Sequence, residues 1–247
     1  MGRDSFRTVD GRVATAVTAD EMREVDRVAV EEVGLAVLQM MEHAGRAFAW
    51  HVRDARGSRR ADGADDEVVV LAGDGGNGGG GLVCARRLAN RGVPVRVVLD
   101  RPTADLTGVA EHQHRILDAM GVPVAAGVDA LPAADDAVVV ADALVGYGLS
   151  GALRSPAREY VERANASPGP VVSLDVPSGL DATTGEAAGP AVVPDRTVTL
   201  ALPKTGLDAV GGRLFLADLT IPATVYDRLG IDYRYPFGDD DWVELVR

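Results

Sequence analysis

Cysteine and lysine are almost absent from this sequence, and aromatic residues make up only 4% of it. The single cysteine, Cys84, excludes an internal disulfide and with it the class of small secreted disulfide scaffolds. Its place in the apolar helical pattern LVCARRLA predicts a buried, inert thiol. The start of the chain lacks the apolar stretch of a secretory signal, and no apolar run approaches the roughly 20 residues of a membrane span. We therefore expect a cytoplasmic protein with no membrane partner.

Positive charge is also scarce. The 247 residues carry a formal net charge of −12 at pH 7. This balance excludes a broad binding surface for nucleic acid or for anionic membranes, because both partners select basic faces. Of the 25 basic residues only Lys204 is a lysine. Either it has been retained by chance, or it has a task that arginine does not perform, such as proton transfer.

The sequence predicts one domain preceded by a polar arm. A hydrophobic content of 47% over 247 residues is enough for one substantial core. We place the arm at residues 1–17 and the single domain at residues 18–247. No internal repeat divides the domain.

The domain begins with two helical patterns. Thr18 and Glu21 form a capping box that starts the first helix, which ends at Gly34. The second helix is expected over about 35–53. The charged, glycine-punctuated stretch 54–67 then predicts an exposed loop.

From residue 67 onward, short β-branched runs alternate with helical patterns. Such alternation is typical of an α/β fold whose parallel sheet has helices on both faces. Two further strands are expected in RTVTLALP and GRLFLADL, and a short helix in PATVYDRLG. The first five strands are predicted at 67–72, 93–99, 122–127, 136–144 and 170–176.

Residues 73–81 read GDGGNGGGG and lie between the first of these strands and a helix. Glycine lets a ligand approach the backbone, so a ligand loop is favoured there over a flexible linker. Gly73, Gly75 and Gly78 satisfy the dinucleotide pattern G-x-G-x-x-G, with Asp100 at the ribose-binding distance, although so many glycines satisfy many patterns. A Walker A loop is excluded because leucine and valine follow Gly81.

Ligands of open parallel sheets bind beyond the carboxyl ends of the strands. Three more strand exits carry polar side chains there. Asp142 lies in DALVGYGLSG, where it either braces the turn or contacts a ligand. Asp175 and Ser178 flank the rigid turn of DVPSG, and Lys204 lies in ALPKTGL.

These motifs together resemble the NAD(P)H-hydrate epimerase family, whose fold is that of the YjeF N-terminal domain. The resemblance covers residues 18 to about 230. It implies a three-layer αβα Rossmann-like sandwich with a central, mostly parallel sheet. The motifs that carry it are, in order, TADEMREVD, MEHAG, GDGGNGGGGLV, DALVGYG, LDVPSGLD and LPK.

The resemblance also implies an activity and its residues. The family interconverts the R and S forms of hydrated NADH or NADPH at C6, so that a separate ADP- or ATP-dependent dehydratase can restore the cofactor. Carried over by position, a potassium ion would be held by Asn77, Asp142 and Ser178. Asp175 would be the principal acid–base residue, with Lys204 assisting. The hydrate would contact Gly76, Asn77, Gly78, Gly79, Gly80, Gly146, Tyr147, Gly148, Leu149, Ser150, Gly151, Ala152 and Asp175.

Three positions depart from the family pattern. Gly76 replaces an asparagine, Gly80 replaces an aspartate that would hold substrate hydroxyls, and His43 replaces the asparagine of M-E-N-A-G. His43 either joins the site or is an ordinary hydrogen-bonded helix residue.

Two alternatives to an epimerase therefore stay open. One is a catalytically impaired relative that serves as a nucleotide-ligand binding or scaffold domain. The other is an NAD-dependent oxidoreductase that uses the glycine pattern and Asp100, although no Tyr-x-x-x-Lys pair supports it. A homodimer is compatible with all three hypotheses.

Overall fold

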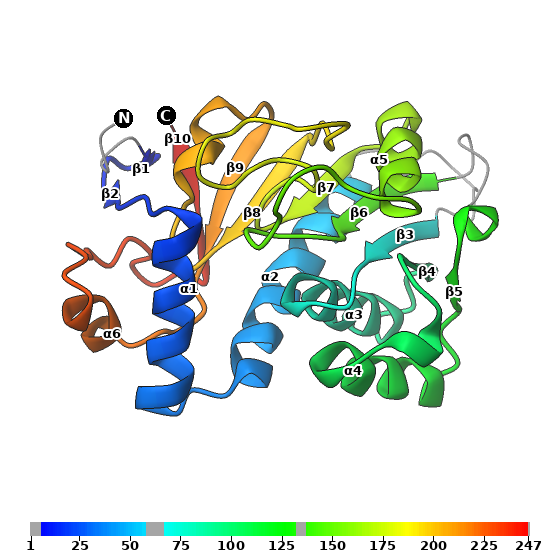
Figure 1. Cartoon of the computed structure of the whole chain (residues 1–247), viewed down its shortest axis with the longest axis horizontal. Coiled ribbons are helices and arrows are strands. Elements are labelled where there is room, and N and C mark those ends of the chain that lie inside the picture. Colours follow the sequence, from blue (N-terminus) through cyan, green and yellow to red (C-terminus); the bar gives the residue numbers. More distant parts are fainter. Residues whose placement is uncertain (1–5, 58–66, 132–136, 247) are drawn as a thin grey trace.

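The computed structural model describes residues 6–57, 67–131 and 137–246. Their strands form a ten-stranded sheet in the order β2-β1-β10-β9-β8-β7-β6-β3-β4-β5 (Figure 1). The strands span β1 Phe6–Thr8, β2 Val13–Ala14, β3 Glu67–Ala72, β4 Val95–Leu99, β5 Val124–Ala126, β6 Ala137–Ala143, β7 Val171–Leu174, β8 Arg196–Leu200, β9 Arg213–Ala217 and β10 Trp242–Val246. The longer helices span α1 Ala19–Arg27, α2 Val37–Gly57, α3 Gly76–Ala89, α4 Gly108–Ala119, α5 Ala157–Ala166 and α6 Ala223–Arg228.

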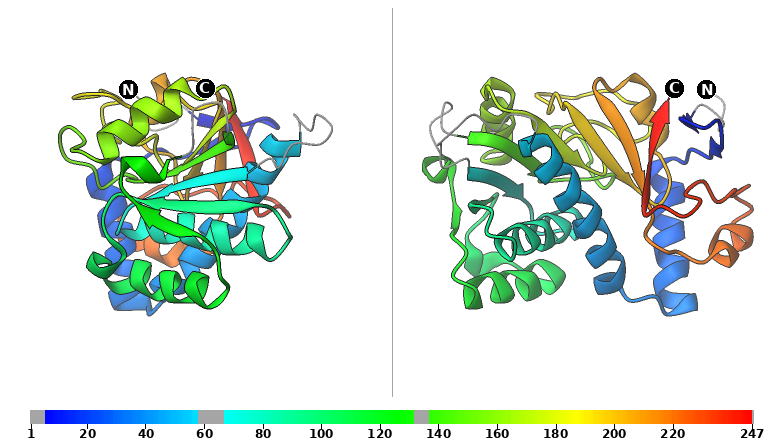
Figure 2. Two further views of the ribbon diagram at one scale, coloured as in Figure 1. Left: turned by 90° about the vertical axis from the view of Figure 1, so that its right-hand side faces the viewer. Right: turned by 180° about the vertical axis from the view of Figure 1, so that it is seen from behind.

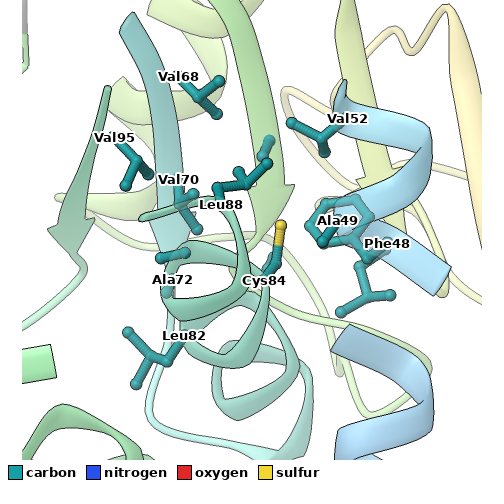
Figure 3. Close-up of a cluster of buried hydrophobic side chains, with 14 of the residues drawn as sticks. Phe48, Ala49, Val52, Val68, Val70, Ala72, Leu82, Cys84, Leu88 and Val95 are labelled. Carbon is teal, nitrogen blue, oxygen red and sulfur yellow. The ribbon is translucent and has the colours of Figure 1, made fainter. Parts of the chain in front are cut away.

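The seven strands from β5 to β9 pair in parallel, which confirms the predicted α/β class. Their side chains alternate between two apolar layers, as the period of a strand requires. In β3, Val68 and Val70 face α2 and α3, whereas Val69 and Leu71 pack against the α5 side (Figure 3). Helices therefore cover both faces of the sheet, with α5 on one face and α2, α3 and α4 on the other (Figures 1 and 2).

Cys84 lies in the layer between α3 and the sheet and is fully buried, as predicted (Figure 3). Burial raises the pKa of its thiol, because the apolar surroundings disfavour the thiolate. The side chain therefore acts as a small hydrophobe and not as a nucleophile.

The other edge of the sheet is antiparallel and was not expected. β10 pairs antiparallel with β9, β1 with β10, and β2 with β1. Residues 6–14 thus supply two short strands where we predicted a polar arm, because Phe6 is fully buried in the core beside Leu245. The first and last described strands along the chain, β1 and β10, consequently lie side by side (Figure 2).

Helix α1 begins as the sequence predicted. The Thr18 hydroxyl accepts from the Glu21 N–H at 3.2 Å, and the Glu21 carboxylate accepts from the Thr18 N–H at 2.9 Å. The helix continues as a π-helical turn, Val28–Val33, and ends where Gly34 adopts a φ of +84°. The next helix, α2, includes residues 54–57 of the stretch predicted to be a loop, and residues 58–66 of that stretch lie outside the described residues.

The glycine run is mostly helix and not a loop, which corrects the sequence prediction. α3 starts at Gly76, so five of its first six residues are glycine. Several of these glycines permit close packing. At Gly78 an added Cβ would lie 1.7 Å from the Gly73 carbonyl oxygen, and at Gly81 it would lie 2.6 Å from the Ala143 Cβ. At Gly79 the added Cβ would lie 2.4 Å from the Met41 methyl group.

Among the helices of the described residues, none is long and apolar enough to cross a membrane.

A buried histidine lies on the side of α2 that faces the sheet. His51 packs against Phe215, with ring centroids 4.2 Å apart, and its two ring nitrogens have no hydrogen-bond partner in the described part of the chain. Burial, reinforced by Arg196 and Arg213, lowers its pKa from 6.5 to about 3. His51 is therefore neutral in the folded protein at neutral pH.

Replacing Gly78 by alanine should destabilise the fold by several kcal/mol. The new Cβ would meet the Gly73 carbonyl, a backbone atom that cannot rotate away. At Gly76, in the same turn, an added Cβ meets nothing within 4 Å, so Gly76→Ala should be neutral or stabilising by about 0.5 kcal/mol. Urea unfolding of both variants checks this, and equal stabilities would contradict the packing role of Gly78.

His51 should make the fold sensitive to mild acid. Because its pKa is lower in the folded than in the unfolded state, the unfolded chain binds the extra proton, and stability falls as pH falls from 6.5 towards 3. The slope from this residue approaches about 1.4 kcal/mol per pH unit. Urea unfolding at several pH values should show a shallower slope for His51→Leu, whereas His114→Leu on α4 should keep the wild-type slope. An unchanged slope in His51→Leu would contradict this assignment.

Candidate active site

Four strand exits meet at one edge of the sheet, because β3, β6, β7 and β8 are consecutive neighbours in it. A cavity of about 480 Å³ opens there and extends to α1 and α2. Its lining residues are Met22, Arg23, Asp26, Val37, Met40, Met41, Ala44, Asp74, Gly75, Gly76, Asn77, Asp100, Arg101, Leu144, Val145, Gly146, Tyr147, Gly148, Asp175, Leu200, Lys204 and Leu219.

Asp175 follows the last residue of β7 and adopts a φ of +66°, which is unusual for any residue except glycine. Its N–H donates to the Val198 carbonyl at 2.7 Å, which ties this strained residue to β8. The carboxylate turns into the cavity, where Oδ2 accepts from the Tyr147 N–H at 3.0 Å. Backbone strain held by such contacts is characteristic of functional residues.

Lys204 completes a buried ion pair with Asp175. Its Nζ donates to Asp175 Oδ1 at 2.5 Å and to the Leu200 carbonyl at 2.8 Å, although the lysine is only 1% exposed. The same Nζ lies 5.6 Å from the centre of the Tyr147 ring. The single lysine of the chain is thus placed at the acid–base residue that the resemblance implied.

Asp142 lies behind the cavity wall and is completely buried. Its carboxylate accepts from the Ser178 hydroxyl at 2.6 Å, the Ser178 N–H at 2.9 Å and the Ser173 hydroxyl at 2.8 Å. All these donors are neutral. Burial raises the pKa of Asp142 and these hydrogen bonds only oppose that rise.

Hydrogen bonds to two backbone groups fix the orientation of the Asn77 amide. Its nitrogen donates to the Leu174 carbonyl and its oxygen accepts from the Gly146 N–H, both at 3.3 Å. Gly146 is confined by the side chains of Asn77 and Asp175, since an added Cβ would lie 3.1 Å from the Asn77 amide and 2.7 Å from Asp175 Oδ2.

The predicted substrate-contact residues fall into two groups. Gly76, Asn77, Gly146, Tyr147, Gly148 and Asp175 line the cavity. The others do not line it: three are packed inside α3, and four follow Gly148 in the chain. Of those four, Leu149 and Gly151 border a separate hollow of about 280 Å³. The residues outside the cavity are Gly78, Gly79, Gly80, Leu149, Ser150, Gly151 and Ala152.

Gly80 and His43, which differ from the family pattern, lie outside the cavity lining. An added Cβ at Gly80 would meet the Leu174 methyl group at 2.8 Å, so this position faces the core between α3 and β7. His43 is half-buried on α2, and its Nδ1 has no hydrogen-bond partner among the described residues.

Several cavity residues were not identified from the sequence. Asp26 of α1 is the clearest case: its carboxylate accepts from the Tyr147 hydroxyl at 2.5 Å. A signal was present, since Asp26 is the last residue of the motif TADEMREVD. Met41 and Ala44 of the apolar wall lie in the motif MEHAG, whereas Met40 had no signal of its own, because helical spacing also predicts core residues.

Charged side chains form the end of the cavity near β4. Arg101 contacts both carboxylate oxygens of Asp100, at 2.9 and 3.2 Å, and reaches Asp74 at 3.4 Å. Asp74 also accepts from the Thr107 N–H at 2.7 Å. Across residues 6–57, 67–131 and 137–246, no group of three His, Cys, Asp or Glu side chains could hold a metal ion.

Comparisons with known proteins identify the family of this chain. A protein named NAD(P)H-hydrate epimerase from Dehalogenimonas lykanthroporepellens is 43% identical over 94% of this chain and 93% of its own length. A protein named bifunctional NAD(P)H-hydrate repair enzyme Nnr from Salinibacter ruber is 39% identical over 86% of this chain, which spans only 42% of that longer protein.

The crystal structure of yeast ynu0 superimposes with a TM-score of 0.81 at 25% identity, over 93% of this chain and 99% of the yeast chain. Residues 37–206 match the family described as the YjeF-related protein N-terminus, which is more than half of the sequence. This chain therefore belongs to the YjeF-related N-terminal domain family.

Proposed function

We propose that this protein is an NAD(P)H-hydrate epimerase, which interconverts the R and S forms of hydrated NADH or NADPH at C6. The observation that carries the proposal is the buried Asp175–Lys204 pair in the cavity wall, with Asp175 in a strained conformation. The name of the Dehalogenimonas relative, at 43% identity over nearly the full length, supports the same activity.

Epimerisation requires that a bond at C6 to oxygen is broken and remade. A carboxyl group that is held in place can give a proton to the leaving oxygen or take one from the incoming oxygen. Asp175 is held by the Lys204 ammonium and by the Tyr147 N–H, so its oxygens have a fixed direction. Lys204 balances the charge of this carboxylate, which is only 3% exposed.

The cavity also suits the anionic part of a dinucleotide. The N-terminus of α3 opens into it at Gly75 and Gly76, where unpaired backbone N–H groups and the helix dipole favour a phosphate. The absence of a side chain at either position lets the phosphate approach the backbone.

The proposal includes a potassium ion held by Asn77, Asp142 and Ser178. Hard, weakly held cations take oxygen ligands of this kind. One observation supports it: among the described residues, the fully buried Asp142 carboxylate accepts hydrogen bonds from neutral donors and has no positive charge beside it. When bound, the ion would balance the charge of Asp142 and link the exits of β3, β6 and β7.

The proposed partner is a dehydratase that acts on the epimerised hydrate. The Salinibacter relative is named as a bifunctional NAD(P)H-hydrate repair enzyme, and this chain spans 42% of its length. We also propose that both act in the cytoplasm, and that a homodimer is compatible with the fold.

A non-catalytic ligand-binding or scaffold domain is the competing function. It was motivated by the glycines at positions 76 and 80. Gly76 has open space around it and Gly80 faces Leu174, so neither substitution removes the acid–base pair. The epimerase is therefore the function we favour.

Asp175→Asn should lower the epimerisation rate by about 10²-fold or more, because an amide cannot exchange the required proton. The experiment starts from the separated R hydrate of NADH and follows the appearance of the S form with potassium present. Asp208→Asn, which lies outside the cavity lining, should leave the rate unchanged. A wild-type protein that does not exceed the spontaneous rate would refute the proposed function.

Potassium should stabilise the protein in a way that depends on Asn77. At about ten times its dissociation constant, a bound ion adds about 1.4 kcal/mol, or roughly 3–6 °C in melting temperature for a chain of this size. Melting in potassium chloride is compared with melting in choline chloride at equal ionic strength. Asn77→Ala should lose the difference, and Asn90→Ala at the exposed end of α3 should keep it. Equal melting temperatures of the wild type in both salts would contradict the ion site.

A further inference from the structure

A second carboxyl group lines the cavity, at a different point from Asp175. Asp26 comes from α1, near the N-terminus, whereas Asp175 follows β7 in the middle of the chain. Asp175 is paired with Lys204 at 2.5 Å. In the described part of the chain, Asp26 forms no ion pair, and its hydrogen bond comes from the neutral hydroxyl of Tyr147 at 2.5 Å.

Tyr147 connects the two carboxyl groups. Its N–H donates to Asp175 Oδ2 at 3.0 Å and its hydroxyl donates to Asp26 Oδ2. The ring between these two ends lies beside the Lys204 ammonium, 5.6 Å from it. The two carboxyl groups are thus held one tyrosine side chain apart, and a rigid ring sets their spacing.

Inversion at C6 by way of a planar intermediate requires proton transfer on both faces of the ring, and one carboxyl group reaches only one face. If the oxygen leaves from one face of the ring and a water adds to the other, each face needs its own acid–base group. The first must supply a proton to the leaving hydroxyl, and the second must accept a proton from the incoming water. A pair of carboxyl groups in different environments is suited to these two roles.

We propose that Asp26 is the second acid–base residue of this site, and that Tyr147 positions it relative to Asp175. This inference rests on the proposed epimerase function. In one direction Asp26 gives its proton to the C6 hydroxyl, which leaves as water while the ring nitrogen lone pair forms the N1–C6 double bond. A water then adds to the other face of C6, and Asp175 takes its proton. One turnover leaves Asp26 ionised and Asp175 protonated, and the starting state returns when Asp175 releases its proton to solvent and Asp26 takes one up from solvent. The reverse direction exchanges the two roles.

The surroundings of Asp26 suit an acid. Burial raises its pKa, and the nearby charge of Asp175 raises it further, whereas the Tyr147 hydrogen bond and Lys204 oppose the rise. Arg23, also on α1, lines the same cavity, and the buried Tyr226 of α6 lies close enough for the charge of Asp26 to raise its pKa. The Tyr147 hydroxyl keeps its proton, because burial and the Asp26 charge raise its pKa. The proton that moves therefore belongs to Asp26 and not to Tyr147.

Asp26→Asn tests the catalytic role. It should lower kcat by about 10²-fold or more in both directions, and it should remove the fall in rate that the wild type shows as pH rises through the pKa of Asp26. Asp26→Glu should recover part of kcat. Glu24→Gln, an exposed carboxylate on the same helix, should leave kcat and the pH profile unchanged. Urea unfolding of each variant reports separately on the fold.

Tyr147→Phe tests the positioning role. It keeps the ring and the N–H that binds Asp175 but removes the hydroxyl that lowers the pKa of Asp26. The alkaline limb of the pH profile should therefore move to higher pH, and kcat should fall about tenfold with KM unchanged. A loss of packing alone would not move this limb.

The possible results separate this inference from the proposed function. If Asp26→Asn keeps the wild-type kcat and alkaline limb while Asp175→Asn is inactive, the role of Asp26 is refuted and the epimerase stands. If Tyr147→Phe leaves the limb in place, the positioning role is refuted. If the wild type itself does not accelerate the interconversion of the R and S hydrates, the proposed function is refuted, and with it the role of Asp26.

Discussion

Helix α3 begins in direct contact with the ends of the central strands, and the site depends on this close approach. Five of its first six residues have no side chain, so the helix backbone reaches the Gly73 carbonyl and the Cβ of Ala143. The one side chain in this turn, Asn77, is thereby placed beside Gly146 and Leu174. The same approach brings α2 close, and α2 supplies the apolar wall of the cavity. Glycine here provides packing space, and its conformational freedom is secondary.

Asp26, Asp142 and Asp175 differ in what surrounds them, and the surroundings decide what each can do. Asp142 is fully buried among neutral donors, which suits a structural or cation-binding carboxylate. Asp175 is paired with an ammonium group in the cavity wall. Asp26 is partly buried beside a tyrosine hydroxyl, with a raised pKa. A single residue type thus fills separate roles because desolvation and neighbouring charge differ over short distances.

The sequence was sufficient to predict the α/β class, most parallel strands, the capping box of α1 and the family. These features depend on the local spacing of apolar residues and on motifs that span a few residues. It was not sufficient for β1, β2 and β10, whose pairing joins the two ends of the chain. The Asp26–Tyr147 contact was missed for the same reason, since it joins residues 121 positions apart. The glycine run was misread because glycines that allow close packing and glycines that form a loop look identical in sequence.

The glycine at position 80 illustrates how a departure from a family pattern depends on its neighbours. In this chain position 80 faces Leu174, whose methyl group would lie 2.8 Å from an added Cβ. An aspartate there would need Leu174 to move, and Leu174 immediately precedes Asp175. Gly80 therefore lets Leu174 pack fully against α3, which steadies the strand end that carries the strained Asp175. The substitution that first raised doubt about activity is, in this packing, compatible with an intact acid–base pair.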